Sequence, residues 1–573
     1  MAAPFGRPRT TPREVCPAPP GVRGGFETGS KPELSVLIAS HDRPEKLRRC
    51  LVSLAEQTAD PASFEVIVAD DGSPEGTAQA VEAFKAPWAL RLLRLPKGGK
   101  AKALNAGIEA AAAPACVFLD DDILAAPGLV TAYLAAYREQ PLTLGIGRLE
   151  QRPPADGNWA GVAHAAAWNE RYGELMRREA DWPDTYGGNF SAPREQLREV
   201  GGFETEIEAI EDIELGYRLT KAGCEPRYLP EAGGVHDDEK PRAKILAEVA
   251  RYGAFCTEFA EQVPEGRRKL LGWFLEPTPR EVMLRRLLLA LRVPPGLLAS
   301  LGRAIPGAGR KRVWLGFVTR YTFWRGARSG MSRRRWLQST RGVPVLMYHA
   351  FGEDEEGDRF AISRRAFARQ LRLLRLLRYR VIGFTELTRV LRSDEAPPPR
   401  TAVITIDDGY VDNLTIAKPL LRRHRFPATV FLVSGRLGEI NDWTKEGAVA
   451  GRRLLSEAEA TELAGDGIEI GAHTRTHPAL TAIAGEERST ELLGSRQDLE
   501  ALLGAPVRTF AYPYGFFSAD AVAAVGEAGY EGACTVENRL ARLGDDPLEI
   551  PRVEIHGTDS ALTFLRKIWL GGA

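Results

Sequence analysis

Short apolar runs alternate with amphipathic helical patterns along most of this 573-residue chain, and this alternation constrains the fold more than any other feature. In the first part of the chain, predicted helices at 44–57, 74–84 and 100–112 separate four such runs. The runs are LSVLIAS (34–40), FEVIVADD (64–71), LRLLRL (90–95) and ACVFL (115–119). Strands that alternate with helices form right-handed βαβ units and a mainly parallel sheet. We therefore expect an α/β fold here.

A second series of the same kind begins with VPVLMYH at Val343 and continues toward the end of the chain. Its later runs are TAVITI (401–406), PATVFLV (427–433), GIEIGAHT (467–474), RTFAYPYG (508–515) and EGACTV (531–536). The motifs of the two series do not resemble each other, and no repeat of solenoid period is present. The sequence thus predicts two different α/β domains.

The chain divides into four predicted parts. Residues 1–32 are rich in Pro, Gly and Arg without periodicity, so we expect a flexible tail. The two α/β domains are predicted at 33–240 and 342–573. Between them, 241–341 is helical in pattern, and we interpret it as a basic connector.

Composition bears on the cellular location. No run approaches about 18 apolar residues and the start carries no apolar signal segment, so we expect neither a spanning helix nor export. The six cysteines are scattered without a C-x-x-C pair, which agrees with a reducing compartment. These features favour a cytoplasmic protein.

Acidic side chains follow three strands of the first domain. Asp42 follows the first strand, Asp70 and Asp71 end the second, and 120–122 (DDD) follow the fourth. Ligands bind beyond the carboxyl ends of such strands. Adjacent carboxylates repel each other unless a cation neutralises them, so a divalent metal that holds a diphosphate is expected. In the alternative interpretation, these aspartates bind no metal and occupy the loops because Asp favours turns.

Five motifs in order give the first domain a family resemblance. They are V-x-I-x-x-x-D-R (36–43), D-D-G-S (70–73), G-G-K-x-x-A-L-N (98–105), D-x-D (120–122) and E-D (211–212). Residues from Leu34 to about Asp238 resemble a family 2 inverting glycosyltransferase with the A-type nucleotide-sugar-binding fold. The resemblance implies a nucleoside diphosphate sugar as donor and Mg²⁺ or Mn²⁺ as cofactor.

The same resemblance assigns roles to residues. Asp212 would be the general base that deprotonates the acceptor. Asp120 and Asp122 would hold the metal, with His236 a further candidate for a metal or phosphate contact. The implied nucleotide-sugar contacts are Asp42, Asp70, Asp71, Lys100, Asp120 and Glu211.

In the second domain, polar side chains again follow strands. His349 follows the first strand, Asp407 and Asp408 follow TAVITI, and His473 and His477 lie four residues apart. Two histidines and a carboxylate form an N,N,O set that suits zinc or a similar divalent ion and leaves positions open for water and substrate. The other aspartate of the pair could act as a base.

The motifs T-I-D-D-G (405–409), H-T-x-x-H (473–477) and R-x-F-x-x-P-Y (508–514) give residues Val343 to Val553 a second resemblance. They resemble the polysaccharide deacetylases of carbohydrate esterase family 4, which adopt a distorted (β/α) barrel and remove N-acetyl groups. The resemblance makes Asp407 the general base and Asp408, His473 and His477 the metal ligands. The implied remaining site residues are Tyr512, Pro513 and Tyr514 in the substrate groove, with His349 and His556 as further candidates.

Two departures leave an alternative open. Ala511 stands where many members of that family have an Arg that orients the base, and the D-x-x-D-W acid motif is absent. The second domain would then be a non-catalytic carbohydrate-binding module. In another alternative, the chain is mainly a scaffold for a membrane assembly.

The connector carries a marked charge excess. Residues 283–341 contain fourteen Arg or Lys and no acid, although the whole chain balances 76 basic against 76 acidic groups. Aromatic residues interleave with these charges at Trp314, Phe317, Tyr321, Phe323 and Trp324, a pattern that favours contact with an anionic membrane surface. A packed helical bundle with a solvated basic face is the alternative. We expect no nucleic-acid partner, because no nucleic-acid-binding fold accompanies the patch.

Together the two resemblances predict a bifunctional carbohydrate enzyme. It would transfer a sugar, with inversion, to a glycan or lipid-linked acceptor and remove an acetyl group from an acetylated sugar. Both steps would occur on the cytoplasmic side of the membrane, where nucleotide sugars are found, and peripheral attachment there is an additional expectation.

Overall fold

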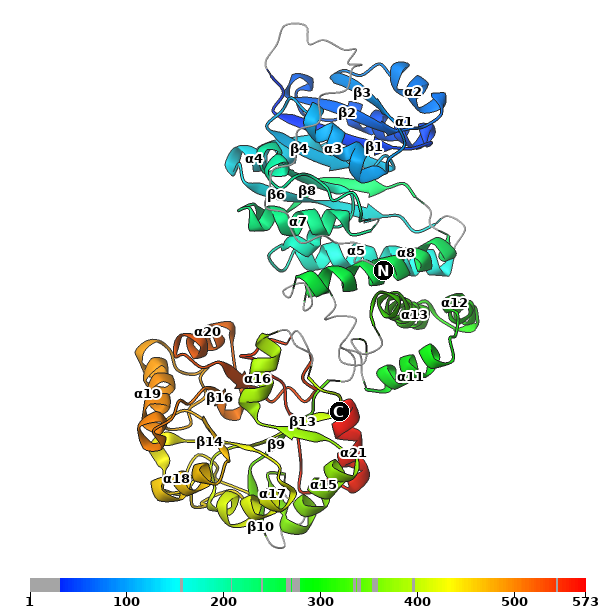
Figure 1. Cartoon of the computed structure of the whole chain (residues 1–573). Coiled ribbons are helices and arrows are strands. Elements are labelled where there is room, and N and C mark those ends of the chain that lie inside the picture. The colour runs from blue at the N-terminus through cyan, green and yellow to red at the C-terminus, as the bar shows by residue number, and fades with distance from the viewer. Residues whose placement is uncertain are drawn as a thin grey trace. The chain divides into compact units, whose positions relative to one another are not determined.

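The computed structural model describes residues 31–154, 158–207, 209–238, 241–263, 269–270, 279–332, 336, 342–352, 359–393, 397–542 and 545–572. The predicted tail lies outside these residues except for its last two positions. Contacts divide the chain into two compact units (Figure 1). Unit 1 comprises 1–262 and 288–330, and unit 2 comprises 263–287 and 331–573.

Among the described residues, the strands of unit 1 form one eight-stranded sheet in the order β3-β2-β1-β4-β7-β6-β8-β5. The pairs β1–β2, β2–β3, β1–β4 and β6–β8 are parallel, whereas β7 runs antiparallel to its neighbours and β5 antiparallel to β8. The strands are β1 (Leu34–Ser40), β2 (Phe64–Asp71), β3 (Ala89–Leu95), β4 (Ala115–Leu119), β5 (Ile123–Ala125), β6 (Thr143–Gln151), β7 (Asn189–Pro193) and β8 (Glu225–His236).

Both faces of this sheet are buried. Val36 and Ile38 of β1 enter one apolar cluster, and Leu37 between them enters the cluster on the other face. The covering helices are α1 (Pro44–Ala55), α2 (Glu75–Glu82), α3 (Lys100–Ala110), α4 (Leu129–Glu139), α5 (Trp159–Leu175), α6 (Arg194–Glu199) and α7 (Glu211–Lys221). The predicted A-type nucleotide-sugar-binding fold is confirmed.

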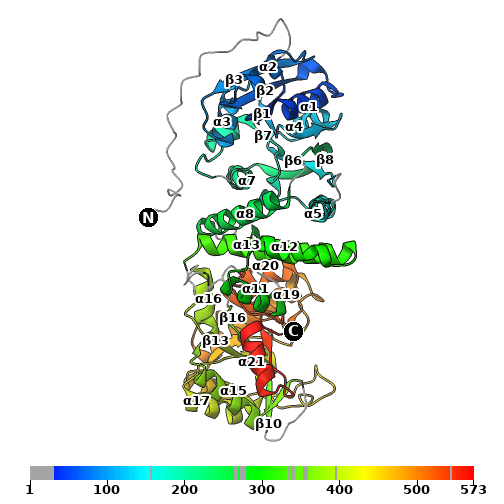
Figure 2. The same ribbon diagram turned by 90° about the vertical axis from the view of Figure 1, so that its right-hand side faces the viewer.

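The predicted connector is helical, but its contacts are divided between the units. Its helices are α8 (Arg242–Gln262), α11 (Pro279–Ala290), α12 (Pro295–Leu301) and α13 (Ala308–Gly330). Helices α8 and α13 lie along each other, and α13 also packs against α5, so both helices are part of unit 1 (Figure 2). The Tyr252 ring of α8 lies 5.6 Å from the Tyr186 ring and 6.0 Å from that of Phe323.

The five aromatic side chains of α13 that the sequence pattern singled out are buried or partly buried. Phe317, Tyr321, Phe323 and Trp324 are buried, and Trp314 is partly buried against the same cluster. The expectation that these rings meet a bilayer is therefore wrong. They supply the core of the α8–α12–α13 bundle, as in the alternative of a packed bundle, because burial of so much aromatic surface is strongly favourable.

Unit 2 contains a second sheet of eight strands among the described residues, and its strand pairs are parallel. The order is β17-β16-β15-β14-β13-β9-β18, with β12 paired to the start of β13. The strands are β9 (Val345–Tyr348), β12 (Arg380–Ile382), β13 (Thr401–Ile406), β14 (Thr429–Leu432), β15 (Glu469–Ala472), β16 (Thr509–Ala511), β17 (Gly532–Cys534) and β18 (Val553–Glu554), beside a separate pair β10 (Ala350–Gly352) and β11 (Ala361–Ser363).

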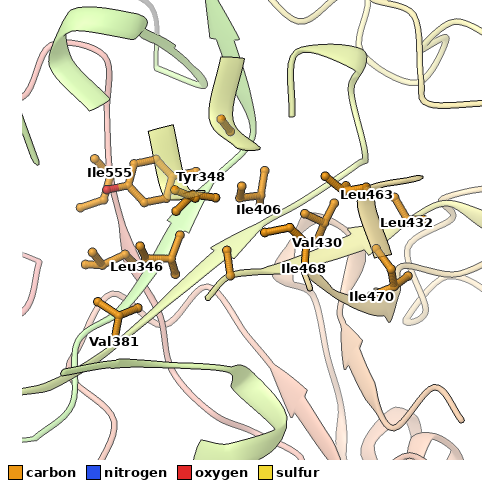
Figure 3. Packing of buried hydrophobic residues seen from close by; sticks show 14 of the residues in the cluster. Leu346, Tyr348, Val381, Ile406, Val430, Leu432, Leu463, Ile468, Ile470 and Ile555 are labelled. Carbon is orange, nitrogen blue, oxygen red and sulfur yellow. The ribbon is translucent and has the colours of Figure 1, made fainter. Parts of the chain in front are cut away.

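Apolar residues of these strands pack under the surrounding helices. Leu346, Ile406, Val430 and Ile470 come from four different strands and belong to one cluster (Figure 3). The helices are α15 (Arg364–Leu376), α16 (Phe384–Arg392), α17 (Lys418–His424), α18 (Glu457–Gly465), α19 (Gly485–Leu503), α20 (Ala519–Glu527) and α21 (Ala561–Leu570). This curled parallel sheet with outer helices confirms the predicted distorted (β/α) barrel.

Candidate functional sites

The three aspartates after β4 point in different directions. Asp121 is buried, accepts a hydrogen bond from Ser40 Oγ at 2.8 Å, and has its pKa raised by burial. Asp120 and Asp122 instead lie on the side of His236. The D-x-D spacing thus selects two carboxylates for the site and leaves the middle one structural.

Asp120, Asp122 and His236 offer ligand atoms within 4.8 Å of one another. His236 ends β8, which pairs with β5 and thereby brings its Nε2 to 3.2 Å from Asp122 Oδ1. Its Nδ1 lies 3.0 Å from Gln151 Oε1, which leaves Nε2 as the ligand atom. Burial alone would raise the pKa of Asp122, but His236 and the nearby cations hold it below its usual range. Two carboxylates and an imidazole fit a divalent cation such as Mn²⁺ or Mg²⁺.

A small pocket adjoins this set. Lys100 Nζ lies 2.7 Å from Asp120 Oδ1 and 3.7 Å from Glu211 Oε1. Gly188 has a φ of +74°, and a Cβ there would overlap with the Asp120 carboxylate, so this position requires glycine. The pocket is lined by Lys100, Leu104, Phe118, Leu119, Asp120, Gly188, Phe190, Phe203, Glu211 and Asp212.

Asp212 lies in the first turn of α7, with its side chain toward this pocket. Its carboxylate accepts hydrogen bonds from the backbone N–H groups of Gly187 and Ile213, both at 2.9 Å. Desolvation and the neighbouring Glu211 raise the pKa of Asp212 to about 7. A carboxylate with this pKa is suited to accept a proton near neutral pH.

The three other predicted nucleotide contacts cluster around one loop. Asp71 Oδ1 accepts hydrogen bonds from the N–H groups of Gly98 (2.6 Å) and Gly99 (3.0 Å). Asp70 Oδ1 accepts one from the N–H of Ser73, whose hydroxyl in turn accepts one from the N–H of Asp42. The structure thus brings these residues together at the carboxyl ends of β1 and β2, and Asp42 is the exposed member.

In unit 2, Asp408, His473 and His477 converge as the sequence predicts. Asp408 Oδ1 lies 3.6 Å from His473 Nε2 and 3.4 Å from His477 Nε2, and the two Nε2 atoms are 3.2 Å apart. His473 Nδ1 donates to the carbonyl of Ala511 at 2.7 Å, so its Nε2 lone pair is free for a metal. Burial lowers the pKa of both histidines, which keeps them neutral. This donor set fits zinc.

Asp407 is held by a residue that the sequence analysis missed. Arg552, after the last short run of the domain, is almost completely buried and bonds both oxygens of Asp407, at 2.6 and 2.7 Å. Burial alone would raise the pKa of Asp407, but Arg552 lowers it to about 2. The available signal in the sequence was an Arg between the apolar residues Ile550 and Val553. Arg552 thus orients the predicted base, a role that was in doubt because Ala511 stands at the position of the family's usual Arg.

The histidine candidates differ in position. His349 Nε2 lies 4.0 Å from Asp407 Oδ2. His556 Nε2 instead lies 3.3 Å from Glu554 Oε1 and is more exposed. The structure therefore places His349, rather than His556, beside the predicted base.

Only one of the three predicted groove residues presents its side chain to solvent. Tyr512 is buried and donates a hydrogen bond to the carbonyl of Leu548, and Pro513 is buried beside it. Tyr514 is half-exposed, and its ring lies 4.7 Å from that of His477. Of the three residues predicted for the groove, only Tyr514 can therefore offer its side chain to a substrate, and the groove itself stays a prediction.

Comparisons with known proteins give a family match for each unit. A family model described as Glycosyl transferase family 2 matches residues 35–200, and one described as Polysaccharide deacetylase matches 394–533. The uncharacterized glycosyltransferase YfnE of Bacillus subtilis (strain 168) is 36% identical over 275 residues, which cover 39% of this chain and 70% of YfnE.

Two further relatives match different parts of the chain. The validoxylamine A glucosyltransferase of Streptomyces hygroscopicus subsp. limoneus is 30% identical over 288 residues, or 45% of this chain and 62% of that protein. The poly-beta-1,6-N-acetyl-D-glucosamine N-deacetylase of Staphylococcus aureus (strain MRSA252) is 24% identical over 230 residues, or 39% of this chain and 76% of that protein.

The chain belongs to family 2 of the glycosyltransferases, and its second unit is a polysaccharide deacetylase domain fused to the first. The protein therefore joins a glycosyltransferase domain and a polysaccharide deacetylase domain in one chain. The alternative of a non-catalytic binding module is not supported, since the predicted base, its Arg552 partner and the three ligands are all in place.

Proposed function

We propose that unit 1 transfers a sugar from a nucleoside diphosphate to an acceptor hydroxyl by in-line displacement. The observation that carries this proposal is Asp212, a carboxylate with a pKa of about 7 in a pocket shared with Asp120 and Lys100. Asp212 accepts the acceptor proton, and Lys100 offers positive charge to the diphosphate. A divalent cation held by Asp120, Asp122 and His236 would neutralise the leaving diphosphate.

For unit 2, we propose hydrolysis of an N-acetyl group. Asp407, held by both oxygens to Arg552, accepts the proton of the attacking water. Burial lowers the pKa of His349, which lies beside Asp407, to about 4, so this histidine is neutral near pH 7. Asp407 therefore passes the proton that it took from the water on to the leaving amine. Zinc or a similar ion on Asp408, His473 and His477 would polarise the carbonyl and stabilise negative charge on its oxygen.

The relatives support a substrate class. One is named as a glucosyltransferase and another as a deacetylase of an N-acetylglucosamine polymer. We propose that the two units act on one glycan that contains an N-acetylated hexosamine, free or lipid-linked, in the synthesis of a cell-surface glycan.

Cytoplasmic location and peripheral membrane contact also belong to this proposal. Among the described residues, no helix combines the length and apolar character needed to cross a bilayer. Leu291, Leu297, Leu301 and Val313 are exposed in a segment whose charged groups are all basic. Exposed leucines beside arginines suit an anionic lipid surface better than the buried aromatic rings do. Sedimentation with vesicles containing phosphatidylglycerol, compared with phosphatidylcholine alone, tests this contact.

The two activities are tested with two variants of the full chain. Asp212→Asn is expected to slow sugar transfer about 10²- to 10⁴-fold and to keep acetate release. His473→Ala is expected to lose acetate release and to keep sugar transfer. Loss of both activities in either variant would contradict independent sites.

A further inference from the structure

The outer atoms of the two histidines in the unit 2 site are held differently. His473 Nδ1 donates to a carbonyl, whereas His477 Nδ1 is buried and has no hydrogen-bond partner among the residues that the structure describes. Rings contact His477 instead. Trp443 stacks on it at 4.5 Å between centroids and 20° between planes, and Tyr514 meets it edge-on at 4.7 Å. The orientation of His477 therefore depends on packing, above all against Trp443.

The carboxylate ligand has its own outer contact. Asp408 Oδ2, the oxygen outside the convergent set, accepts a hydrogen bond from the Tyr410 hydroxyl at 2.9 Å. That hydroxyl accepts a hydrogen bond from Asn441 Nδ2 at 2.7 Å. Tyr410 and Asn441 are both buried, so water does not compete for these bonds.

Asn441 also fixes the segment that carries Trp443. Its Oδ1 accepts hydrogen bonds from the N–H groups of Trp443 and Thr444, both at 3.1 Å, and its Nδ2 makes a second bond to the Val449 carbonyl at 3.1 Å. These partners use the side-chain amide fully, with two donated and two accepted bonds. They also define which end of the amide is oxygen, since two N–H groups face one end and a carbonyl faces the other.

We infer that Asn441 is a positioning residue for the metal site of unit 2. One arm runs from Asn441 through the Tyr410 hydroxyl to Asp408, and the other runs through the Trp443 ring to His477. Asp408 follows β13 and His477 follows β15, so one buried amide sets the separation between two ligands that come from different loops. The inference rests on the proposed function, since it requires that this set binds a divalent ion.

The test measures zinc affinity, by competition with a chromogenic chelator, in the full chain. The His473→Ala protein gives the background from other zinc sites, including that of unit 1. Removal of groups that hold metal ligands commonly weakens metal binding 10- to 100-fold, and we expect a loss of about this size for Asn441→Ala. Asn413→Ala is the matched control, because Asn413 is a buried asparagine that donates to the His349 carbonyl and touches none of the three ligands.

A second set of variants separates positioning from general damage to the fold. Tyr410→Phe removes the contact from Asn441 to Asp408, and Trp443→Ala removes the contact to His477. The double variant is expected to lose as much zinc affinity as Asn441→Ala. Adding Asn441→Ala to the double variant should then cost little more, because both arms are already gone. These variants also provide the test if Asn441→Ala does not fold.

The outcomes distinguish this inference from the function on which it rests. If the parent protein binds no more zinc than His473→Ala, the proposed metal site is wrong. If the parent binds zinc, and Asn441→Ala or the double variant stays within twofold of it, the site stands and the positioning role of Asn441 is overturned. Equal losses in Asn441→Ala and Asn413→Ala would also overturn it.

Discussion

Replacement of Arg552 by methionine is the most informative perturbation of unit 2. The substitution keeps much of the side-chain volume but removes both bonds to Asp407 and the Nε–H bond to the Thr535 carbonyl. Loss of one partner of a buried ion pair costs about 3–5 kcal/mol, because the other charge stays buried and unpaired. The unsatisfied carbonyl adds about 1 kcal/mol. We therefore expect the free energy of unfolding of unit 2 to fall by about 4–6 kcal/mol.

Calorimetry of the full chain measures this effect. For a domain of this size, about 2–4 °C of midpoint shift accompanies each kcal/mol, so the unit 2 transition should fall by about 10–20 °C while the unit 1 transition stays in place. The neutralised pair Asp407→Asn with Arg552→Met should be more stable than the sum of the single changes predicts, because it leaves no unpaired charge. A cost below about 1 kcal/mol for Arg552→Met, or strict additivity in the double variant, would refute this reasoning.

Three further predictions concern the two sites. In unit 1, kcat/KM for sugar transfer should rise tenfold per pH unit below about 7 and level off above it, because Asp212 must lose its proton to act as a base. The Asp212→Asn variant should be about 10²- to 10⁴-fold slower and show no such pH dependence, which identifies Asp212 as the titrating group. Gly188→Ala should weaken Mn²⁺ binding and transfer, since its Cβ would displace the Asp120 carboxylate, with deacetylation as the unchanged internal control. Chelator treatment should stop acetate release, and zinc should restore it in the parent but not in His473→Ala; release that survives the chelator would contradict the metal requirement.

Much of the fold and most of the site residues are readable from the sequence because strand periodicity and motif order act locally. The runs at 34–40, 64–71 and 115–119 are β1, β2 and β4, and the acids that follow them meet at one edge of the sheet. Likewise, the pair His473 and His477 with Asp408 forms the predicted ligand set.

Other features depend on tertiary contacts that no local pattern records. Arg552 lies 145 positions from Asp407 in the sequence, and only the pairing of β18 with β9 brings it to the base. The rings of α13 look like a membrane-facing belt in the sequence, yet Tyr321 and Trp324 are buried by the bundle with α8 and α12. The same limit applies to Asn441, whose loop carries no recognisable motif.

The most direct test of the central claim follows both reactions on one product. The full chain, with manganese and zinc, is incubated with a panel of nucleotide sugars and N-acetylglucosamine oligosaccharides, and products are analysed by mass spectrometry beside Asp212→Asn and His473→Ala. We predict a product that has gained a sugar and lost an acetyl group, with the gain absent from the first variant and the loss absent from the second. Sugar gain with every acetyl group intact in the parent protein would contradict a bifunctional enzyme for this substrate class.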